Sequence, residues 1–247
     1  MSEDISTRTG ILIGDEGVER LRSASVVLCG VGAVGGYALE GLVRAGIGRI
    51  RVVDADVFSE SNLNRQILAT VDTVGRGKAE VACERARSIN PSVDIEGVES
   101  IVSAGTVPDI LSGKFDVLVD AIDTIEHKSA LLRAASEQGI RTFSSMGAAL
   151  HMDTTRIRIA TLRKTSVCPV AANVRKRLRD VDTSNITCVY SEEPPLVRPE
   201  ERDAHGKSVL GSLPTIPAIF GMTLANEAIR FILSRERPER SVPNSLI

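Results

Sequence analysis

The feature that most constrains this chain is a glycine-rich turn, Gly30-x-Gly32-x-x-Gly35, directly after the apolar run of residues 25–30. Gly30 allows a tight turn out of a strand, Gly32 leaves room for phosphate oxygens beside the backbone, and Gly35 lets a helix pack against the sheet. The helix that follows presents unpaired N–H groups and a partial positive charge to an anion. The turn therefore predicts phosphate binding at the end of a buried strand. The alternative is a turn used only for packing.

An acidic residue closes the second expected strand, residues 50–54. Asp54 lies 24 residues beyond Gly30, where a carboxylate accepts hydrogen bonds from ribose hydroxyls in nucleotide-binding folds of this kind. Asp56 belongs to the same V-D-A-D run and is assigned to the same site. Turn and acid together predict a nucleotide site, but they do not distinguish NAD from ATP.

Two cations after this acid favour ATP. Arg65 and Lys78 lie 11 and 24 residues beyond Asp54, one before and one at the start of the next expected helix. At the carboxyl edge of a sheet they would neutralise the charge that builds up when the α-phosphate is attacked and pyrophosphate leaves. Asn62 and Gln66 add neutral hydrogen-bonding groups. The alternative is that Arg65 and Lys78 are ordinary solvated charges.

Two carboxylates, Asp120 and Asp123, end the fourth expected strand in the run F-D-V-L-V-D-A-I-D. A carboxylate there can hold Mg²⁺ against ATP phosphates, because Mg²⁺ prefers one or two carboxylates together with phosphate oxygens and waters. We assign the metal role to Asp123 and a supporting role to Asp120. The alternative for Asp123 is a cap on the helix that begins at Thr124.

The order of apolar runs and amphipathic segments predicts an α/β fold, a Rossmann-like, doubly wound and mainly parallel sheet. After Ser145 the strict alternation T-R-I-R-I-A predicts an antiparallel extension with one wet face. We expect a single domain over residues 1–247, with a nucleotide-binding half at about 20–150 and a second half at about 151–235. Strands are expected at 25–30, 50–54, 93–98, 115–120, 141–145, 155–160 and 186–190, and helices near Gly14 and at 33–45, 78–89, 124–138 and 169–179.

Composition narrows the location of the protein. The net charge is −2, so no global field attracts nucleic acid or membrane. The first ten residues contain no apolar core of a secretory signal, and the four scattered cysteines suit a reducing cytosol. The apolar stretch 217–233 contains charged residues and is interpreted as a buried or dimer-facing helix. We therefore expect a cytoplasmic protein without stable membrane insertion. The Pro-rich, charged segment 192–208 is expected to be a surface loop.

Taken together, the motifs G-x-G-x-x-G, V-D-A-D, S-N-L-N-R-Q, G-x-x-K-A-E and D-A-I-D resemble the adenylating superfamily of ubiquitin-activating-like enzymes, which includes the thiamine- and molybdopterin-pathway adenylyltransferases. The resemblance covers about residues 6–235, and S-N-L-N-R-Q is its most specific element. The segments R-T-G-I-L-I-G-D-E-G-V-E-R-L, N-I-T-C-V-Y-S-E-E-P-P and G-S-L-P-T-I-P-A-I-F-G-M are similar to the tRNA-modifying branch.

This resemblance implies ATP and Mg²⁺ as cofactors and tRNA carrying threonylcarbamoyladenosine as the substrate. The threonyl carboxylate would be adenylated and then attacked from within the same nucleoside, closing a ring with release of AMP and pyrophosphate. It also implies a homodimer in which an arginine near the N-terminus, here Arg8, reaches the site of the other subunit. The implied nucleotide contacts are Gly30, Gly32, Gly35, Asp54, Asp56, Asn62, Arg65, Gln66 and Lys78, with Asp123 binding the metal.

Two alternatives remain open. One is an adenylyltransferase that activates the C-terminal glycine of a ubiquitin-like sulfur carrier, and a sulfur-transfer protein also remains a possible partner. Many such relatives carry two C-x-x-C pairs for zinc, which this chain lacks. Cys168 and Cys188 lie in the half where some relatives form a thioester, but we interpret them as packing residues. The other alternative is a non-catalytic regulator that binds NAD or ATP.

A basic stretch in the second half fits an RNA partner, because arginine and lysine supply sequence-independent contacts to phosphates. The alternative is a solvated helix face. The residues assigned to tRNA are Arg156, Arg158, Arg163, Lys164, Arg175, Lys176, Arg177 and Arg179.

Overall fold

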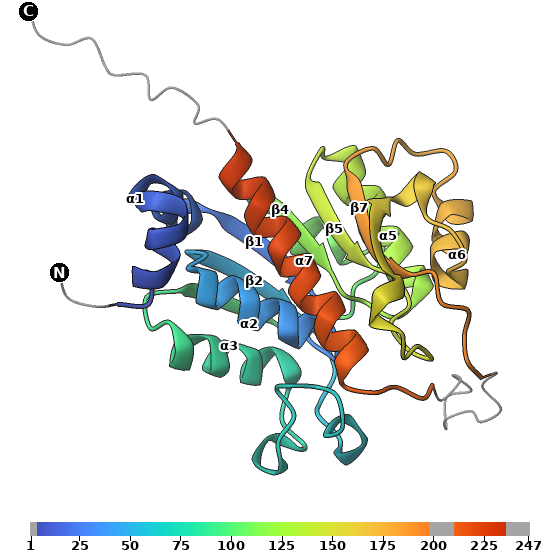
Figure 1. Cartoon of the computed structure of the whole chain (residues 1–247), viewed down its shortest axis with the longest axis horizontal. Coiled ribbons are helices and arrows are strands. Elements are labelled where there is room, and N and C mark those ends of the chain that lie inside the picture. Colours follow the sequence, from blue (N-terminus) through green and yellow to red (C-terminus); the bar gives the residue numbers. More distant parts are fainter. Residues whose placement is uncertain (1–3, 198–209, 236–247) are drawn as a thin grey trace, which may run out of the picture.

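The computed structural model describes residues 4–197 and 210–235, so most of the segment 192–208 lies outside the described residues. A seven-stranded sheet with the order β3-β2-β1-β4-β5-β7-β6 forms its centre, and helices cover both faces (Figure 1). Six strands run parallel, and β6 alone pairs antiparallel, with β7. The strands are β1 (Ser25–Cys29), β2 (Arg49–Val53), β3 (Asp94–Val98), β4 (Val117–Asp120), β5 (Arg141–Ser145), β6 (Ile157–Thr161) and β7 (Ile186–Ser191).

This topology confirms the predicted fold class. The chain moves from β1 outward to β2 and β3, then crosses to the other side of β1 for β4, β5 and β7. The order of the strands therefore reverses beside β1, and ligands of open α/β sheets bind at such a switch point, outside the carboxyl ends of the strands. The glycine-rich turn follows β1 and thus lies at this point.

The side chains of alternate strand residues pack into two hydrophobic layers, one on each face of the sheet. Val26 and Leu28 pack with residues of α1, α2, α3 and α7, whereas Val27 and Cys29 pack with residues of α4 and α5. A third cluster joins β7 to α6. The helices are α1 (Thr7–Ser23), α2 (Gly35–Ala45), α3 (Lys78–Ile89), α4 (Val107–Ile110), α5 (Ile125–Glu137), α6 (Pro169–Arg177) and α7 (Thr215–Ser234).

The helix α7 corresponds to the apolar stretch expected to be buried or dimer-facing. It packs along α2 and against β4 and β5, and Phe220, Leu224 and Ala228 are fully or almost fully buried (Figure 1). By length and composition it is also the one helix among the described residues that could cross a membrane, but 44% of its apolar window is buried inside the protein. The buried side confirms the interpretation as a core helix.

Two local expectations need correction. Helix α1 begins at Thr7 rather than near Gly14, because Gly14 interrupts a longer helix with non-helical angles (φ 72°, ψ 170°) instead of starting it. In β6 the alternating pattern does not produce one buried face, since Ile159 is 46% exposed. Ile157 packs against the main hydrophobic cluster, but that cluster does not extend to Ile159 on the same face of the strand.

Candidate functional site

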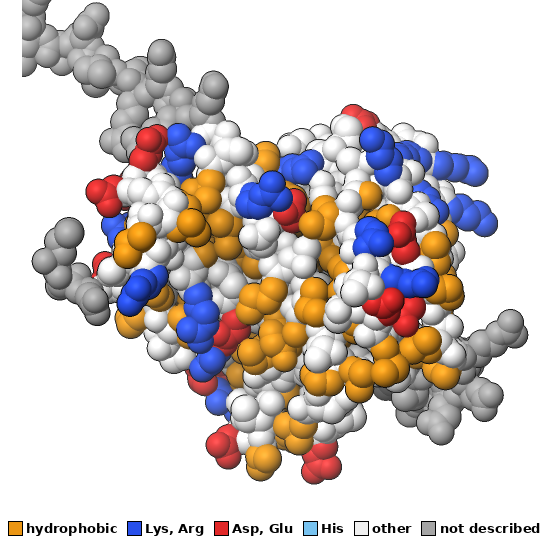
Figure 2. All heavy atoms as spheres, viewed as in Figure 1, with side chains coloured by type: hydrophobic (Ala, Val, Ile, Leu, Met, Phe, Trp, Pro, Cys, Tyr) orange, Lys and Arg blue, Asp and Glu red, His pale blue; other side chains and the backbone are white. Residues whose placement is uncertain are grey.

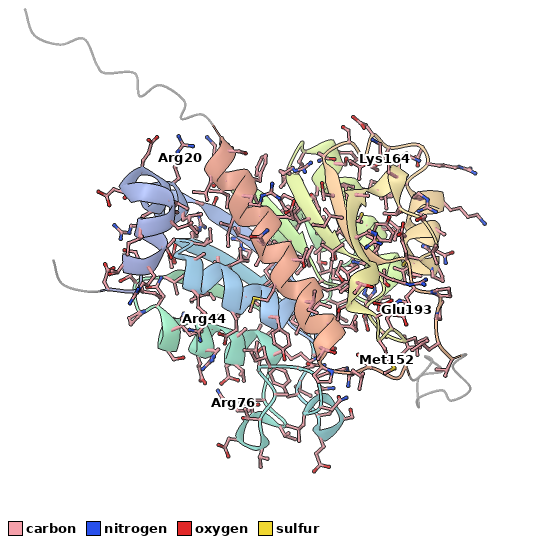
Figure 3. All side chains as sticks on the ribbon, viewed as in Figure 1. Arg20, Arg44, Arg76, Met152, Lys164 and Glu193 are labelled. Atoms are coloured by element: carbon pink, nitrogen blue, oxygen red, sulfur yellow. The ribbon has the colours of Figure 1, made fainter. Side chains whose placement is uncertain are left out.

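The loops that carry the predicted nucleotide-site residues lie at one edge of the sheet. Parallel strands end at the same edge, so the loops after β1, β2 and β4 lie side by side there. The loops after β5 and β7 extend this edge, and Met152 and Glu193 mark them in Figure 3. One Glu193 carboxylate oxygen accepts the backbone N–H groups of Met152 and Asp153, each at 2.9 Å, which ties these two loops together.

The glycine-rich turn is packed too closely for side chains at two positions. Gly30 has a positive φ of 85°, and a Cβ there would lie 2.9 Å from the carbonyl oxygen of Ala121. A Cβ on Gly35 would lie 1.8 Å from the carbonyl oxygen of Gly30. A Cβ on Gly32 would meet nothing closer than 3.7 Å, at the Gln66 amide. Gly30 and Gly35 are therefore required by the fold itself, whereas a Cβ on Gly32 would make only ordinary contacts with Gln66.

Asp54 lies directly beside this turn. Its carboxylate accepts the N–H of Val31 at 2.8 Å and the N–H of Asp56 at 2.9 Å. Burial raises the pKa of Asp54, and the nearby Lys78 ammonium and the two backbone hydrogen bonds oppose this shift. The structure thus brings the acid and the phosphate turn together in the arrangement that the sequence predicts.

Lys78, at the start of α3, is buried, so it is not an ordinary solvated charge. Its Nζ lies 3.0 Å from a carboxylate oxygen of Asp56 and 5.9 Å from the centroid of the Phe58 ring. A buried ammonium needs a counter-charge, and here the Asp56 carboxylate, itself 73% exposed, supplies it. This arrangement holds a positive charge at the ligand edge.

The loop between β2 and α3 carries the remaining polar candidates. Arg65 donates to the carbonyl oxygen of Ser61 and to the side chain of Asn64, each at 2.8 Å. The Asn62 side chain accepts the N–H of Ser59, which caps a short 3-10 helix. Gln66 is buried beside Gly32, and its Oε1 has no hydrogen-bond partner within the described part of the chain. Such an atom fits a polar ligand lying over the turn.

At the end of β4 the two carboxylates differ sharply. Asp123 is exposed in the loop before α5 and accepts the Thr124 hydroxyl at 3.1 Å. Asp120 is fully buried, and its Oδ2 accepts Lys128 Nζ and Ser144 Oγ, each at 2.6 Å. Asp120 is thus bonded to side chains of α5 and β5, and its supporting role stays a prediction.

Sequence reasoning missed Lys128 and Ser144. The available signal is that Lys128 occupies the apolar stripe of α5 together with Leu131, Leu132 and Ala135, all of them buried. A lysine at such a position indicates a buried ion pair.

The basic stretch divides into structural and exposed cations. Arg163 donates to the carbonyl oxygens of Leu178 and Val181, each at 2.9 Å, and Arg175 donates to that of Thr165, also at 2.9 Å. These two arginines hold the backbone around α6. Arg156 forms an ion pair with Asp153, and Arg158 forms one with Glu192.

The remaining cations of this stretch form what we call the basic face. They surround α6, where Lys and Arg side chains project at the right of Figure 2. The basic face consists of four exposed residues, Lys164, Lys176, Arg177 and Arg179.

The cysteines are buried, which agrees with the interpretation as packing residues. Burial raises the pKa of Cys188 to about 12 and also raises that of Cys29. A thiol needs its thiolate form to act as a nucleophile, so neither position suits a thioester. Arg8, in contrast, is exposed near the start of α1. It is not among the residues that form the site described above.

Comparison with known proteins agrees with this geometry. The sequence matches the ThiF family over residues 7–246. The tRNA threonylcarbamoyladenosine dehydratase of Bacillus subtilis is 32% identical over 238 residues, covering 92% of this chain and 94% of the relative. The crystal structure of Escherichia coli tRNA N6-threonylcarbamoyladenosine dehydratase in complex with ATP superimposes with a TM-score of 0.83 at 31% identity, covering 92% of each chain.

A shorter similarity reaches the sulfur-carrier branch. The sulfur carrier protein adenylyltransferase of Thermus thermophilus is 43% identical over 111 residues, which is 45% of this chain and 41% of that protein. The similarity to this branch thus extends over less than half of each chain. The family match over almost the whole length, together with relatives of the same extent, shows that this chain belongs to the ThiF family.

Proposed function

We propose that this protein is an ATP-dependent tRNA threonylcarbamoyladenosine dehydratase. It adenylates the threonyl carboxylate of the modified nucleoside and then closes a ring with release of AMP. The observation that carries this proposal is the buried Lys78 ammonium, held at the ligand edge next to Asp54 and the glycine-rich turn. A cation held at this place suits the departure of pyrophosphate, because it can neutralise the charge that builds up on the leaving group.

The proposed orientation of ATP follows from the residues at this edge. The backbone around Gly32 and the start of α2 bind its phosphates, and the Asp54 carboxylate accepts hydrogen bonds from the ribose hydroxyls. Lys78 and Arg65 stabilise the negative charge on the leaving pyrophosphate. The orphan Oε1 of Gln66 can accept a hydrogen bond only from a donor group of ATP, such as a hydroxyl or amino group, while the amide N–H of Asn62 can donate to phosphate oxygens.

Mg²⁺ fits the site only together with the nucleotide. Among the described residues no cluster of three or more acidic, histidine or cysteine side chains exists that could hold a metal by itself. An exposed single carboxylate, Asp123, suits an ion that takes its other ligands from phosphates and water. When bound, Mg²⁺ would supply charge neutralisation at the phosphates.

The proposed reaction has two steps, adenylation and ring closure. An oxygen of the threonyl carboxylate attacks the α-phosphorus, and the bond to pyrophosphate breaks. A nucleophilic atom of the same nucleoside then attacks the acyl carbon, loses its proton, and the carbon–oxygen bond to AMP breaks. The net change is the loss of one water from the nucleoside, driven by conversion of ATP to AMP and pyrophosphate.

The remaining partners follow from exposed surfaces. The basic face is the surface that we propose for tRNA, since its four cations are exposed. For a homodimer, Tyr37, Ile219 and Met222 line a largely apolar hollow of about 440 Å³ between α2 and α7, and Figure 2 shows hydrophobic side chains over this part of the molecule. Ile11 and Leu12 of α1 are 77% and 84% exposed, close in sequence to Arg8. In such a dimer, Arg8 would reach the nucleotide site of the partner subunit. We place this homodimer in the cytoplasm.

The test is release of AMP from labelled ATP. One reaction contains tRNA with threonylcarbamoyladenosine, a second the same tRNA without that modification, and a third no RNA. We expect AMP only with the modified tRNA, accompanied by loss of one water from the nucleoside. AMP formed instead with a ubiquitin-like carrier ending in Gly-Gly would replace this function by the sulfur-carrier alternative, which the shorter similarity favours.

A further inference from the structure

A buried cluster of polar side chains lies next to the loop that carries Asp123. Asp120 at the end of β4, Lys128 on α5 and Ser144 on β5 are 0%, 1% and 0% exposed. Asp120 Oδ2 accepts Lys128 Nζ and Ser144 Oγ at 2.6 Å each, and Lys128 Nζ and Ser144 Oγ are 3.5 Å apart. Three elements of the fold are thus joined at one carboxylate oxygen.

Stability alone does not explain this cluster. Transfer of an ammonium and a carboxylate out of water is costly, and apolar side chains of similar volume often replace a buried ion pair without loss of stability. The surroundings here are apolar, with Leu131 and Leu132 on the same helix fully buried. A buried pair that persists in such a place is better explained by the geometry that it imposes.

The second oxygen of Asp120 shows what that geometry is. Oδ1 accepts the N–H of Ile122 at 3.1 Å, so the carboxylate also holds the loop that follows β4. This loop rests on the phosphate turn: the N–H of Ala121 donates to the carbonyl oxygen of Cys29 at 2.8 Å, and the Ala121 carbonyl oxygen is what a Cβ on Gly30 would meet. Asp123 follows one residue after Ile122.

We propose that the Lys128–Asp120–Ser144 cluster positions the loop Ala121–Asp123 for the adenylation step. Lys128 and Ser144 fix one carboxylate oxygen so that the other holds the Ile122 N–H, and this sets the place of the Asp123 carboxylate relative to the phosphate turn. All three are positioning residues, because they act through the loop and do not touch the nucleotide. The inference rests on the proposed function, in which Asp123 binds Mg²⁺ with ATP.

The reason for a lysine follows from the same contacts. Without its ammonium, the Asp120 carboxylate would be a buried charge whose remaining donors are one hydroxyl and one N–H. Rotation of that carboxylate out of the interior would release the Ile122 N–H. Lys128 thus fixes the orientation of Asp120, and Asp120 fixes the loop.

Two double variants separate positioning from stability. Asp120→Leu with Lys128→Met removes both charges and the acceptor for Ile122. Asp120→Asn with Lys128→Met also removes both charges but keeps a side-chain oxygen that can accept the Ile122 N–H, so it is the matched control. Melting temperature, calorimetric ATP affinity with and without Mg²⁺, and kcat and KM for ATP are measured for each.

We expect both variants to fold. The asparagine variant keeps the strengthening of ATP binding by Mg²⁺ within about threefold of the unmodified protein, and the leucine variant loses this strengthening. In the leucine variant kcat falls by about 100-fold, as for a catalytic group displaced by about 1 Å, and KM for ATP rises with the loss of the Mg²⁺ effect. A leucine variant that keeps both the Mg²⁺ effect and kcat would overturn the inference.

Two further variants keep the test decisive. Ser144→Ala removes a single hydroxyl, and we expect kcat to fall about fivefold at an almost unchanged melting temperature; an unchanged kcat counts against the cluster even where the leucine variant does not fold. Asp123→Asn tests the premise. If it leaves the Mg²⁺ effect intact, the metal role in the proposed function fails, whereas if it abolishes the effect and the leucine variant does not, only the positioning inference fails.

Discussion

The edge of the sheet with the glycine-rich turn, here called the phosphate edge, differs from the basic face in how far its charged side chains are exposed to solvent. At the phosphate edge three charged side chains are buried or bonded to the backbone: Lys78 is 7% exposed, Asp120 is fully buried, and Asp54 accepts two backbone N–H groups. On the basic face, Lys176 and Arg177 are exposed on α6. The first region fixes charges before the ligand arrives, while the second offers charges that a ligand must order.

This difference teaches where single substitutions should act strongly. Fixed charges in a site of low polarity contribute much to a transition state, because no reorganisation is needed during the reaction. Exposed charges are screened by salt and add small, similar increments. We therefore expect large and specific losses at the phosphate edge and modest, salt-dependent losses on the basic face.

The largest effect should come from Lys78→Ala. We expect kcat/KM to fall by about 100- to 1,000-fold, while ATP affinity falls much less, because the ammonium acts on the departing pyrophosphate. AMP release and ATP binding are measured on the same preparation. Lys114→Ala, an exposed lysine just before β4 at the opposite edge, is the matched control and should be normal. Equal losses in binding and turnover by Lys78→Ala would contradict a role in the transition state.

Two glycines test whether the turn serves the fold or the ligand. Gly35→Ala should lower the melting temperature by about 5 °C or more, since its Cβ would lie 1.8 Å from a carbonyl oxygen. Gly32→Ala should leave the melting temperature almost unchanged and weaken ATP binding about tenfold, because its Cβ enters only the space over the turn. Thermal unfolding with and without ATP distinguishes them. A Gly32→Ala protein with normal ATP affinity would remove Gly32 from the site.

Smaller effects are expected on the basic face. Alanine at Lys164, Lys176, Arg177 or Arg179 should each weaken tRNA binding by about two- to fivefold and reduce its salt dependence. The controls are Arg163→Ala and Arg175→Ala, which should chiefly lower the melting temperature by a few degrees, because these side chains hold carbonyl groups. Binding titrations at two salt concentrations provide the measurement. Unchanged salt dependence in all four face variants would move the tRNA surface elsewhere.

The smallest effect should be that of thiol alkylation. Burial raises the pKa of Cys188 to about 12, so its thiol is almost entirely protonated at neutral pH and reacts slowly. Iodoacetamide at neutral pH should therefore leave AMP formation unchanged. Loss of activity together with labelling of Cys168 or Cys188 would instead favour a thioester step and the sulfur-carrier alternative.

The fold was predictable where the signal is local. The helix Lys78–Ile89 and the strand Arg141–Ser145 have the predicted boundaries, and Gly46 ends α2 in the left-handed region with a φ of 92°. Apolar runs, glycine stops and a proline after a helix act over a few residues, so the sequence displays them directly. The helix α4 was not predicted, because a helix of four residues, Val107–Ile110, is too short to show a periodic pattern.

The site was predictable as a set of residues but not as a set of contacts. The motifs locate Gly30, Asp54 and Lys78 at one edge because parallel strands end together. They do not show that Asp120 meets Ser144, 24 residues later, or that Arg163 holds the carbonyl of Leu178. Such contacts depend on how the helices pack against the sheet. The sequence also does not distinguish an exposed lysine or arginine from one that donates hydrogen bonds to the backbone.

The most direct test of the account follows one oxygen atom. Modified tRNA is prepared with a heavy isotope at both oxygens of the threonyl carboxylate, and the AMP released by the protein is examined by mass spectrometry. The account predicts that each AMP carries one heavy oxygen, because a carboxylate oxygen attacks the α-phosphorus and leaves with AMP at ring closure. AMP without the heavy isotope, formed alongside the dehydrated nucleoside, would show that the carboxylate is not adenylated and would contradict the central claim.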